Sequence, residues 1–279
     1  MIDLHSPYPL TPEHGTSFDE QGYIVLTDVL SPQTVRAYEP EITSKVFELN
    51  TQHLPVGERL TAAQRAALQV MNVWQESELV REFVFSPRLA RLAAELLGVD
   101  AVRIYHDQAI YKEPGGGITP WHADQYYWPL QSDRTCSIWI PLQDTPEEMG
   151  PVIYIDGSHK WPDTESMRHF NSQDLDALEA QLMGEGSDSK RRVIALKKGQ
   201  MSFHHSRMIH GSDVNRGSFP RTSIALHMQD EKNRHQIYRS ETGEPWHITN
   251  DDLCRKDANG HPDYTDPSPF PVLFSAKGS

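Results

Sequence analysis

Cysteine is scarce in this sequence, which has only Cys136 and Cys254 among its 279 residues, far apart and outside any Cys-X-X-Cys pair. A disulfide framework and a zinc ribbon both need more cysteines at closer spacing, so we expect neither. Long hydrophobic runs are missing too, since no apolar stretch approaches the roughly 18 residues of a membrane-spanning helix. Residues 1–7 lack the charged and apolar regions of a signal peptide. We therefore expect a cytoplasmic protein.

The sequence also has few positively charged residues relative to its acidic ones. The chain carries 26 Lys and Arg residues against 39 Asp and Glu residues, a formal net charge of −13. Binding to nucleic acid or to an anionic membrane needs a basic surface that neutralises phosphates, and no such stripe exists here. A local basic pocket is still possible. The composition therefore favours a small-molecule partner, and it leaves the oligomeric state open.

What the sequence does have is enough apolar material for a core, with 37% hydrophobic residues. We expect one domain over residues 1–279, because β barrels and sandwiches of this size often form a single domain. Its parts are a mostly helical segment at 1–100, a β-rich core at 101–230 and a C-terminal extension at 231–279. The tail from 257 is rich in Pro, Asp, Gly and Ser, which predicts an irregular or partly disordered wrap.

Helical signals dominate the first hundred residues. A short helix can start near Thr11, and Gly22 to Leu26 is typical of a strand. Ser31 and Pro32 form an N-cap signal for a helix to about residue 50, whose apolar face recurs every three to four residues. Residues 61–98 are predicted to be helical as well, with Pro87 opening the last helix and Gly98 closing it.

From residue 101 onward the pattern changes to short β-rich segments punctuated by Pro and Gly. The predicted strands are 101–111, 119–127, 135–142, 151–155, 191–196, 200–204, 208–213 and 221–229. Eight short strands after a block of helices predict a mainly β fold with flanking helices, a double-stranded β-helix or cupin-like jelly-roll barrel. Residues 162–190 are polar and interrupt the strands, so we predict a lid that orders on substrate binding.

One constellation carries the chemistry. It consists of Trp121-His122-Ala123-Asp124 and, far downstream, Ile209-His210-Gly211-Ser212. Residues i and i+2 of a strand point to one face, so His122 and Asp124 can meet one cation inside a barrel, with His210 arriving from another strand. Two imidazoles and a carboxylate are the ligand set of the facial triad that binds non-haem Fe(II) with open positions.

Other interpretations of these residues remain open at this point. The chain has 14 histidines, so a His-X-Asp triplet can arise by chance, as a strand cap or a surface pair. His106-Asp107, His204-His205 and His159 are not expected to be ligands, because neighbours on a strand face opposite ways. One of these histidines is a candidate for a supporting position beside the metal.

The residues around the triplet bear a resemblance to a known family. Tyr111 to Gln125, with the sequence YKEPGGGITPWHADQ, resembles the phytanoyl-CoA dioxygenase family of Fe(II)/2-oxoglutarate-dependent oxygenases. The later segments follow the family in order, namely WIPL at 139–142, MGP at 149–151, DGSHK at 156–160, KGQMSFHH at 198–205, HGS at 210–212 and Arg221. The resemblance covers roughly residues 20–230.

The resemblance implies specific roles. His122, Asp124 and His210 would be the iron ligands, and Arg221 would pair with the far carboxylate of 2-oxoglutarate, which a guanidinium fork fits and a lysine does not. Ser212 would contact the same carboxylate. Two further residues would lie on strands that line the cosubstrate pocket, Gln108 and Trp139.

Alternation along the last predicted strand supports the role of Arg221 independently. Arg221, Ser223, Ala225 and His227 share one face, whereas the other face carries Thr222, Ile224, Leu226 and Met228. The second set is apolar enough to pack against outer helices, which leaves the Arg221 face for the lumen. A surface salt bridge is the alternative explanation for this arginine.

The implied activity is oxidation of a small organic molecule, with Fe(II), 2-oxoglutarate and O₂ as cofactor and cosubstrates, and most simply its hydroxylation with release of succinate and CO₂. Related halogenases lack the carboxylate ligand, so Asp124 favours hydroxylation. Acyl-type and natural-product substrates both fit, although the acidic chain makes a CoA thioester less attractive. Two alternatives stay open: a cupin-like metalloenzyme that does not use 2-oxoglutarate, and a non-catalytic ligand-binding barrel. The aromatic residues at 125–130 and the segment 71–74 line the substrate pocket or simply pack.

Overall fold

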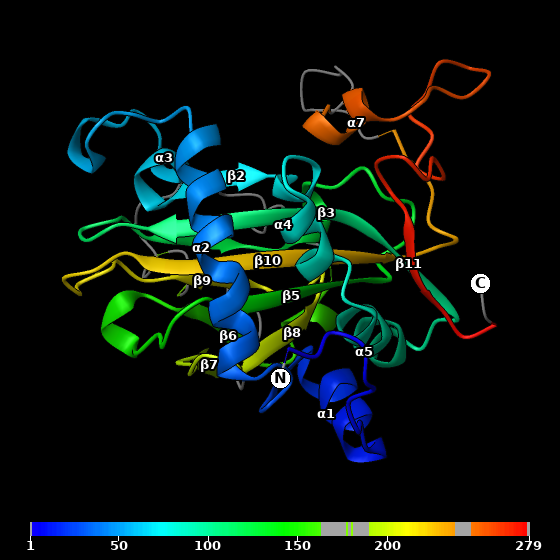
Figure 1. Ribbon diagram of the computed structural model, residues 1–279, viewed down its shortest axis with the longest axis horizontal. Helices are drawn as coiled ribbons and strands as arrows, with labels where there is room; N and C mark the ends of the chain where they lie inside the picture. Colours follow the sequence, from blue (N-terminus) through cyan, green and yellow to red (C-terminus); the bar gives the residue numbers. More distant parts are fainter. Residues whose placement is uncertain (1, 163–176, 178–179, 181–189, 238–246, 278–279) are drawn as a thin grey trace.

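The computed structural model describes residues 2–162, 177, 180, 190–237 and 247–277 (Figure 1). The N-terminal part comprises α1 (Pro12–Gln21), β1 (Tyr23–Leu26), α2 (Pro32–Leu49), η1 (Val56–Glu58), α3 (Ala62–Ala66), β2 (Leu68–Met71), η2 (Val73–Gln75), α4 (Glu78–Val84) and α5 (Pro87–Leu97). The β-rich core follows with β3 (Ala101–Lys112), β4 (Thr119–His122), η3 (Asp124–Tyr126), β5 (Thr135–Pro141), η4 (Glu147–Met149), β6 (Val152–Ile155), η5 (Ser158–Lys160), β7 (Arg191–Val193), β8 (Met201–His205), β9 (His210–Ser212) and β10 (Arg221–Asp230). The C-terminal extension adds α7 (Thr249–Leu253) and β11 (Val272–Ser275).

The helix ends follow the local signals in the sequence. The Ser31 side chain accepts a hydrogen bond from the Thr34 amide at the start of α2, and Ser86 does the same for the Leu89 amide of α5. Each cap satisfies an amide that the helix itself leaves without a partner. Helix α5 ends at Gly98, whose φ of 63° is in the left-handed region that glycine adopts without strain.

Two antiparallel sheets form the double-sheet jelly roll that the strand pattern predicts. The seven-stranded sheet has the order β1-β8-β5-β10-β3-β11, with β2 also paired to β3, and the four-stranded sheet has the order β4-β9-β6-β7. Strand β10 lies between β3 and β5, so its inward side chains sit at the centre of the larger sheet. In the smaller sheet, His122 of β4 and His210 of β9 are register partners.

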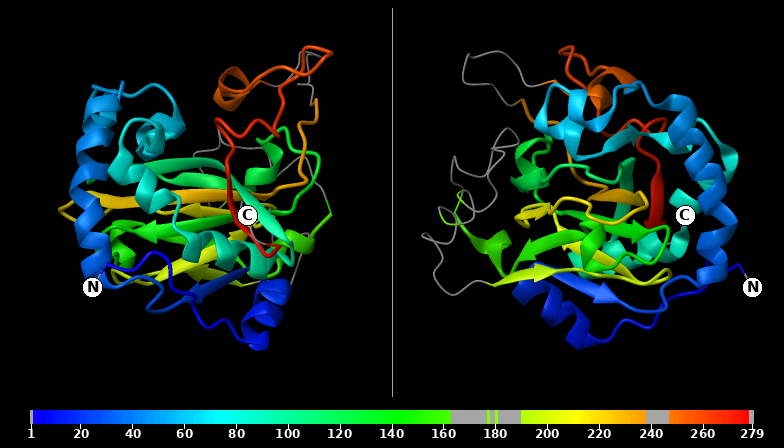
Figure 2. Two further views of the ribbon diagram at one scale, coloured as in Figure 1. Left: turned by 45° about the vertical axis from the view of Figure 1, so that its right-hand side comes forward. Right: turned by 90° about the vertical axis from the view of Figure 1, so that its left-hand side faces the viewer.

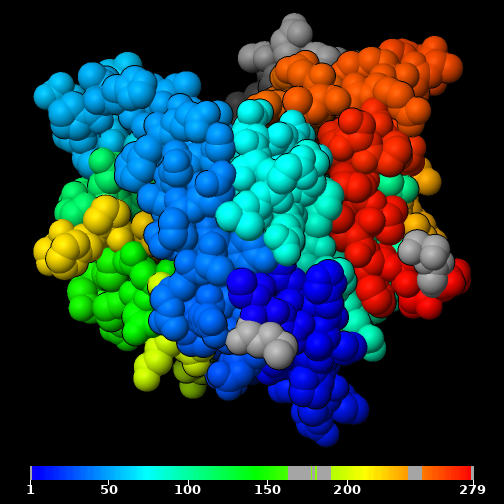
Figure 3. Space-filling view, in the orientation of Figure 1, coloured from blue at the N-terminus to red at the C-terminus, as the bar shows by residue number. Residues whose placement is uncertain are grey.

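The main hydrophobic core lies between the larger sheet and the helices that cover its outer face. Figures 1 and 2 show α2 and α5 against this face, and in Figure 3 the N-terminal segments, blue to cyan, cover its middle. Ile224, Leu226 and Met228 of β10 belong to this core. Arg221, Ala225 and His227 line a cavity on the opposite side of the strand. The alternation predicted for this strand is therefore confirmed.

Three local predictions were wrong. Residues 68–71 are not helical but form β2, because Val70 and its neighbours pair along β3, and sheet contacts override local propensity. The strand predicted over 119–127 ends at His122, and Asp124 opens the 3-10 turn η3. In the tail, Val272–Ser275 forms β11 at the edge of β3 rather than an irregular wrap.

Cys136 and Cys254 are both buried free thiols, as expected. Across the part of the chain that is described, no helix combines the length and apolar character needed to cross a membrane. Almost all of the predicted lid at 162–190 lies outside the described residues.

Candidate metal centre

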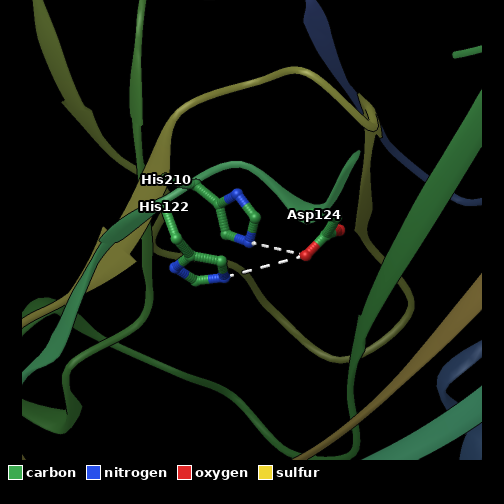
Figure 4. A group of neighbouring side chains, drawn as sticks. All are labelled: His122, Asp124 and His210. Carbon is green, nitrogen blue, oxygen red and sulfur yellow. Dashed lines mark ion pairs between the residues drawn. The ribbon is translucent and has the colours of Figure 1, made fainter. Parts of the chain in front are cut away.

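Two imidazoles and one carboxylate converge inside the barrel, as Figure 4 shows. His122 ends β4, His210 begins β9, and Asp124 begins η3. The Nε2 atoms of both histidines lie 3.7 Å from Oδ1 of Asp124, which is too long for a hydrogen bond. The three donor atoms are all within 4.8 Å of one another, close enough to bind a single metal ion.

The tautomers of both histidines are fixed by backbone carbonyls. Nδ1 of His122 lies 2.8 Å from the Pro120 carbonyl oxygen, and Nδ1 of His210 lies 2.9 Å from that of Met208. A carbonyl can only accept, so Nδ1 carries the proton in each ring and Nε2 presents its lone pair toward Asp124. Such a hydrogen bond to the far ring nitrogen orients a metal-binding histidine. Sequence reasoning could not identify these acceptors, because they are main-chain atoms.

The protonation states suit a divalent cation. Burial, and next the nearby His210, lower the pKa of His122 to about 3. Burial alone would raise the pKa of Asp124, but the surrounding imidazoles of His210 and His204 outweigh it and hold this pKa well below its usual range. A neutral imidazole and an ionised carboxylate are the forms that bind metal, so His122 and Asp124 need no further deprotonation.

The second oxygen of Asp124 is held by groups that the sequence did not reveal. Ser137 of β5 donates its hydroxyl to Oδ2 at 2.8 Å, and its Oγ lies 2.7 Å from Nδ1 of His227. Nε2 of His204 is 3.5 Å from the same Oδ2. These contacts leave Oδ1 as the oxygen that faces His122 and His210. Ser137 could have been found through its register partner, His227 on β10. That pairing is known only from the structure.

A cavity of about 510 Å³ contains the cluster. Its lining also includes all four residues predicted to bind the cosubstrate: Gln108, Trp139, Ser212 and Arg221. The Ser212 hydroxyl donates to Oγ1 of Thr119 at 2.9 Å, and the Gln108 amide donates to Oε1 of Gln69 at 2.7 Å. The structure therefore brings the predicted ligands and the predicted cosubstrate residues into one space.

Arg221 is a buried cation without an anionic partner among the described residues. It is 2% exposed, donates from Nη1 to the Gly150 carbonyl at 2.8 Å, and lies 5.6 Å from the centre of the Trp139 ring. Its Nε is buried and has no hydrogen-bond partner within the described part of the chain. Burial lowers the pKa of Arg221 to about 10, so it is still charged at neutral pH. The surface salt bridge considered for Arg221 is thus ruled out, and its guanidinium can accommodate a carboxylate.

Lys112 is a second buried cation nearby, and sequence reasoning missed it. It is the register partner of Arg221, and its Nζ donates to the Gly117 and Asp213 carbonyls, both at 2.7 Å. Burial, and next the charge of Arg221, hold the pKa of Lys112 well below its usual value. Its hydrogen bonds tie β3 to the loops beside the cavity.

In the pair His106-Asp107 the two side chains point to opposite faces of the strand, as the alternation along a strand predicts. His106 and His204 line the cavity, whereas Asp107 accepts hydrogen bonds from the Val73 and Trp74 amides on the other side of β3. Burial raises the pKa of Asp107 to about 7, and it lowers that of His204 to about 4.

Some of the aromatic and apolar residues at 71–74 and 125–130 line the cavity, and others pack in the hydrophobic core. Met71, Tyr127 and Trp128 line the cavity. Trp74 and Tyr126 instead pack in hydrophobic clusters.

Comparison with known proteins gives the same picture. The chain is 24% identical over 257 residues to an ectoine dioxygenase of Sphingopyxis alaskensis, covering 86% of this chain and 83% of that protein. It is 22% identical over 243 residues to the peroxisomal phytanoyl-CoA dioxygenase of Rattus norvegicus, covering 78% and 68% respectively. Its fold matches the crystal structure of the non-haem alpha-ketoglutarate-dependent carbocyclase SnoK from nogalamycin biosynthesis with a TM-score of 0.76 and 23% identity, covering 96% of this chain and 100% of that one.

A jelly roll that encloses a His-Asp-His cluster beside a buried arginine defines the class of non-haem iron- and 2-oxoglutarate-dependent dioxygenases. The family model described as phytanoyl-CoA dioxygenase (PhyH) matches residues 18–223. The chain belongs to this family.

Proposed function

We propose that this protein hydroxylates a small organic molecule, with His122, Asp124 and His210 as the Fe(II) ligands and Arg221 and Ser212 as the anchor for 2-oxoglutarate. Succinate and CO₂ would be the coproducts. The observation that carries the cosubstrate assignment is the Arg221 guanidinium, which is buried in the cavity of the triad with an unpartnered Nε. A buried cation without a counterion is costly, and a bound carboxylate removes that cost.

The protein groups then have distinct tasks. Bound Fe(II) would supply the activation of O₂, which no side chain can perform. His122, Asp124 and His210 would hold the ion, and three protein ligands of this kind leave coordination positions for exchangeable ligands. Arg221 orients the cosubstrate through a planar fork that matches a carboxylate, with Ser212 beside it. Trp139 and Gln108 form walls that keep the cosubstrate in one orientation.

We assign the substrate to the end of the cavity opposite Arg221. His227 lies six positions beyond Arg221 along β10, about 20 Å of extended chain. Around His227 the wall is made of aromatic and apolar side chains together with residues of α7. Arg221 is the one Lys or Arg side chain among the cavity-lining residues of the described segments. This lining disfavours a polyanionic substrate such as an acyl-CoA.

The experiment is a comparison of wild-type protein with Asp124→Ala. Wild-type protein supplied with Fe(II), 2-oxoglutarate and O₂ is expected to form succinate, even in slow turnover without substrate. The variant is expected to form none while keeping the wild-type circular dichroism spectrum, because it loses an iron ligand but no core side chain. Succinate formation at the wild-type rate by the variant would refute the triad assignment.

A further inference from the structure

Two histidines that are not candidate ligands face each other at the substrate end of the cavity. His106 of β3 is the register partner of His227 of β10, their ring centres are 4.5 Å apart, and both line the cavity. They are only 3% and 4% exposed. Hydrogen bonds on the protein side of each ring determine which of its nitrogens carries the proton.

In His227 the proton is on Nδ1. The single hydroxyl proton of Ser137 is donated to Oδ2 of Asp124. The Ser137 oxygen can then only accept from His227, whose Nδ1 lies 2.7 Å away. Nε2 of His227 is left as an acceptor. It is buried, and no residue that the structure describes gives it a hydrogen bond.

In His106 the proton is on the other nitrogen. The Asn250 amide nitrogen of α7 donates to the Tyr105 carbonyl at 3.1 Å and lies 3.1 Å from Nδ1 of His106. The orientation of this amide is fixed because its oxygen accepts from Asn72 at 3.2 Å. Nδ1 of His106 is therefore an acceptor, and Nε2 carries an N–H for which the described residues offer no hydrogen-bond partner.

We propose that His106 and His227 form a donor–acceptor pair that recognises an uncharged hydroxyl group of the substrate. An alcohol both accepts and donates, so it satisfies both rings. An ammonium group has no lone pair for His106, and a carboxylate has no proton for His227. This inference depends on the proposed function only in placing the substrate at this end.

The wall around the two histidines is aromatic and apolar, so the part of the substrate that carries the hydroxyl should be apolar as well. Trp128 packs edge-on to both imidazoles, with ring centres 4.9 Å from His227 and 5.7 Å from His106. Met71, Tyr127 and Ile248 extend this apolar wall. Ile248 and Asn250 lie outside residues 18–223, the part that matches the family model. The C-terminal extension therefore contributes to the proposed substrate end of the cavity.

The first test reads the two tautomers directly by NMR of ¹⁵N-histidine-labelled protein, with Zn(II) in place of Fe(II) and with 2-oxoglutarate present. His106→Gln and His227→Gln assign the signals. We expect His227 as the Nδ1–H tautomer and His106 as the Nε2–H tautomer. Either ring in the opposite tautomer would overturn the proposal.

The second test compares the binding of four probes with one ring system, by ligand-observed NMR: 2-indanol, indane, 2-aminoindane and indane-2-carboxylate. One or two net hydrogen bonds should make 2-indanol bind about fivefold or more tighter than indane. The two charged probes should bind more weakly than 2-indanol.

The advantage of 2-indanol should disappear in His106→Phe and in His227→Phe. It should persist in His205→Phe, a control on β8 whose side chain is not among those that line the cavity. Equal affinity of the wild-type protein for indane and 2-indanol would contradict the proposal, and so would a charged probe that binds more tightly than 2-indanol. Both outcomes can be read from the wild-type protein alone. Formation of the Fe(II)–2-oxoglutarate complex is measured separately, so failure of the proposed function can be told apart from failure of this inference.

Discussion

At the scale of single residues, the site is defined by the hydrogen bonds that orient its donor atoms. The carbonyls of Pro120 and Met208 turn the two imidazole lone pairs inward, and Ser137 holds the far oxygen of Asp124. A cation that binds here meets groups already in their binding orientation, so little ordering is required on binding. This organisation predicts measurable effects of residues that never touch the metal.

Ser137→Ala removes the hydroxyl between Asp124 and His227. Loss of a hydrogen bond to a ligating carboxylate typically costs 10–100-fold in metal affinity, so we expect Fe(II) binding weakened by about tenfold or more. Anaerobic calorimetric titration measures it. Ser223→Ala is the matched control, since Ser223 is also fully buried but donates to the Ile110 carbonyl. Equal Fe(II) affinity in the two variants would argue against a positioning role for Ser137.

Arg221→Lys keeps the positive charge but loses the planar fork. We expect the dissociation constant for 2-oxoglutarate to rise about tenfold or more, because lysine cannot bind a carboxylate through two parallel hydrogen bonds. Titration of the Fe(II)-loaded protein gives this constant. Arg192→Lys, at a surface pair with Asp156, should leave it unchanged. A lysine variant that binds the cosubstrate as tightly as wild-type would show that charge alone suffices.

At the scale of elements, the close approach of β4 and β9 brings the two histidines together. Gly211 lies within β9 at this contact. A Cβ at Gly211 would lie 2.7 Å from the Thr119 carbonyl oxygen and 3.2 Å from the Trp121 ring. Only glycine allows the strands to come this close, because both neighbouring groups belong to packed parts of β4.

Gly211→Ala is therefore expected to push β9 away from β4 and separate His210 from His122. Both the melting temperature and Fe(II) affinity should fall, the latter by more than tenfold. Gly117→Ala serves as the control, since a Cβ there meets nothing nearer than 3.7 Å. Wild-type Fe(II) affinity in Gly211→Ala would mean that the strand spacing does not set the ligand geometry.

Much of the element pattern could be predicted because strand and helix periodicities are local. Ser31, Pro87 and Gly98 marked helix boundaries correctly. Strands β2 and β11 could not be predicted, because both form by pairing with β3, a contact between distant segments. The same limit applies to the site. The His-X-Asp motif can be recognised in the sequence because its residues are close together along the chain. Ser137, Lys112 and Asn250 reach the site only through tertiary contacts between distant segments, so the sequence does not reveal them.

At the scale of the whole molecule, the barrel buries an unusual number of titratable groups. The folded-state pKa values of four histidines are lowered by burial, to about 3 for His122 and to about 4 for His204, His205 and His227. Burial raises the pKa of Asp107 to about 7, which acts in the opposite direction. Burial also holds the pKa of His106 well below its usual value. Five histidines against one carboxyl leave a net uptake of several protons on unfolding in mildly acidic solution.

The metal-free protein should therefore lose stability as the pH falls. For these histidines the stability is fully present above the unfolded pKa of about 6.5 and is lost as the pH falls toward 4. Between pH 7 and pH 5 the free energy of unfolding should drop by a few kcal/mol. Urea denaturation at pH 7, 6 and 5 measures this drop. A free energy that is flat or rises over this interval would contradict the neutral state assigned to the buried imidazoles.

The central claim is that one cavity binds Fe(II) through His122, Asp124 and His210 and 2-oxoglutarate through Arg221. The most direct measurement is an anaerobic titration of the metal-free protein with Fe(II) and then 2-oxoglutarate, followed by visible absorption. We predict the weak charge-transfer band of the chelated complex in wild-type protein, and its loss in Arg221→Ala at the same cosubstrate concentration. Fe(II) binding without the band in wild-type protein, or an undiminished band in Arg221→Ala, would contradict the account.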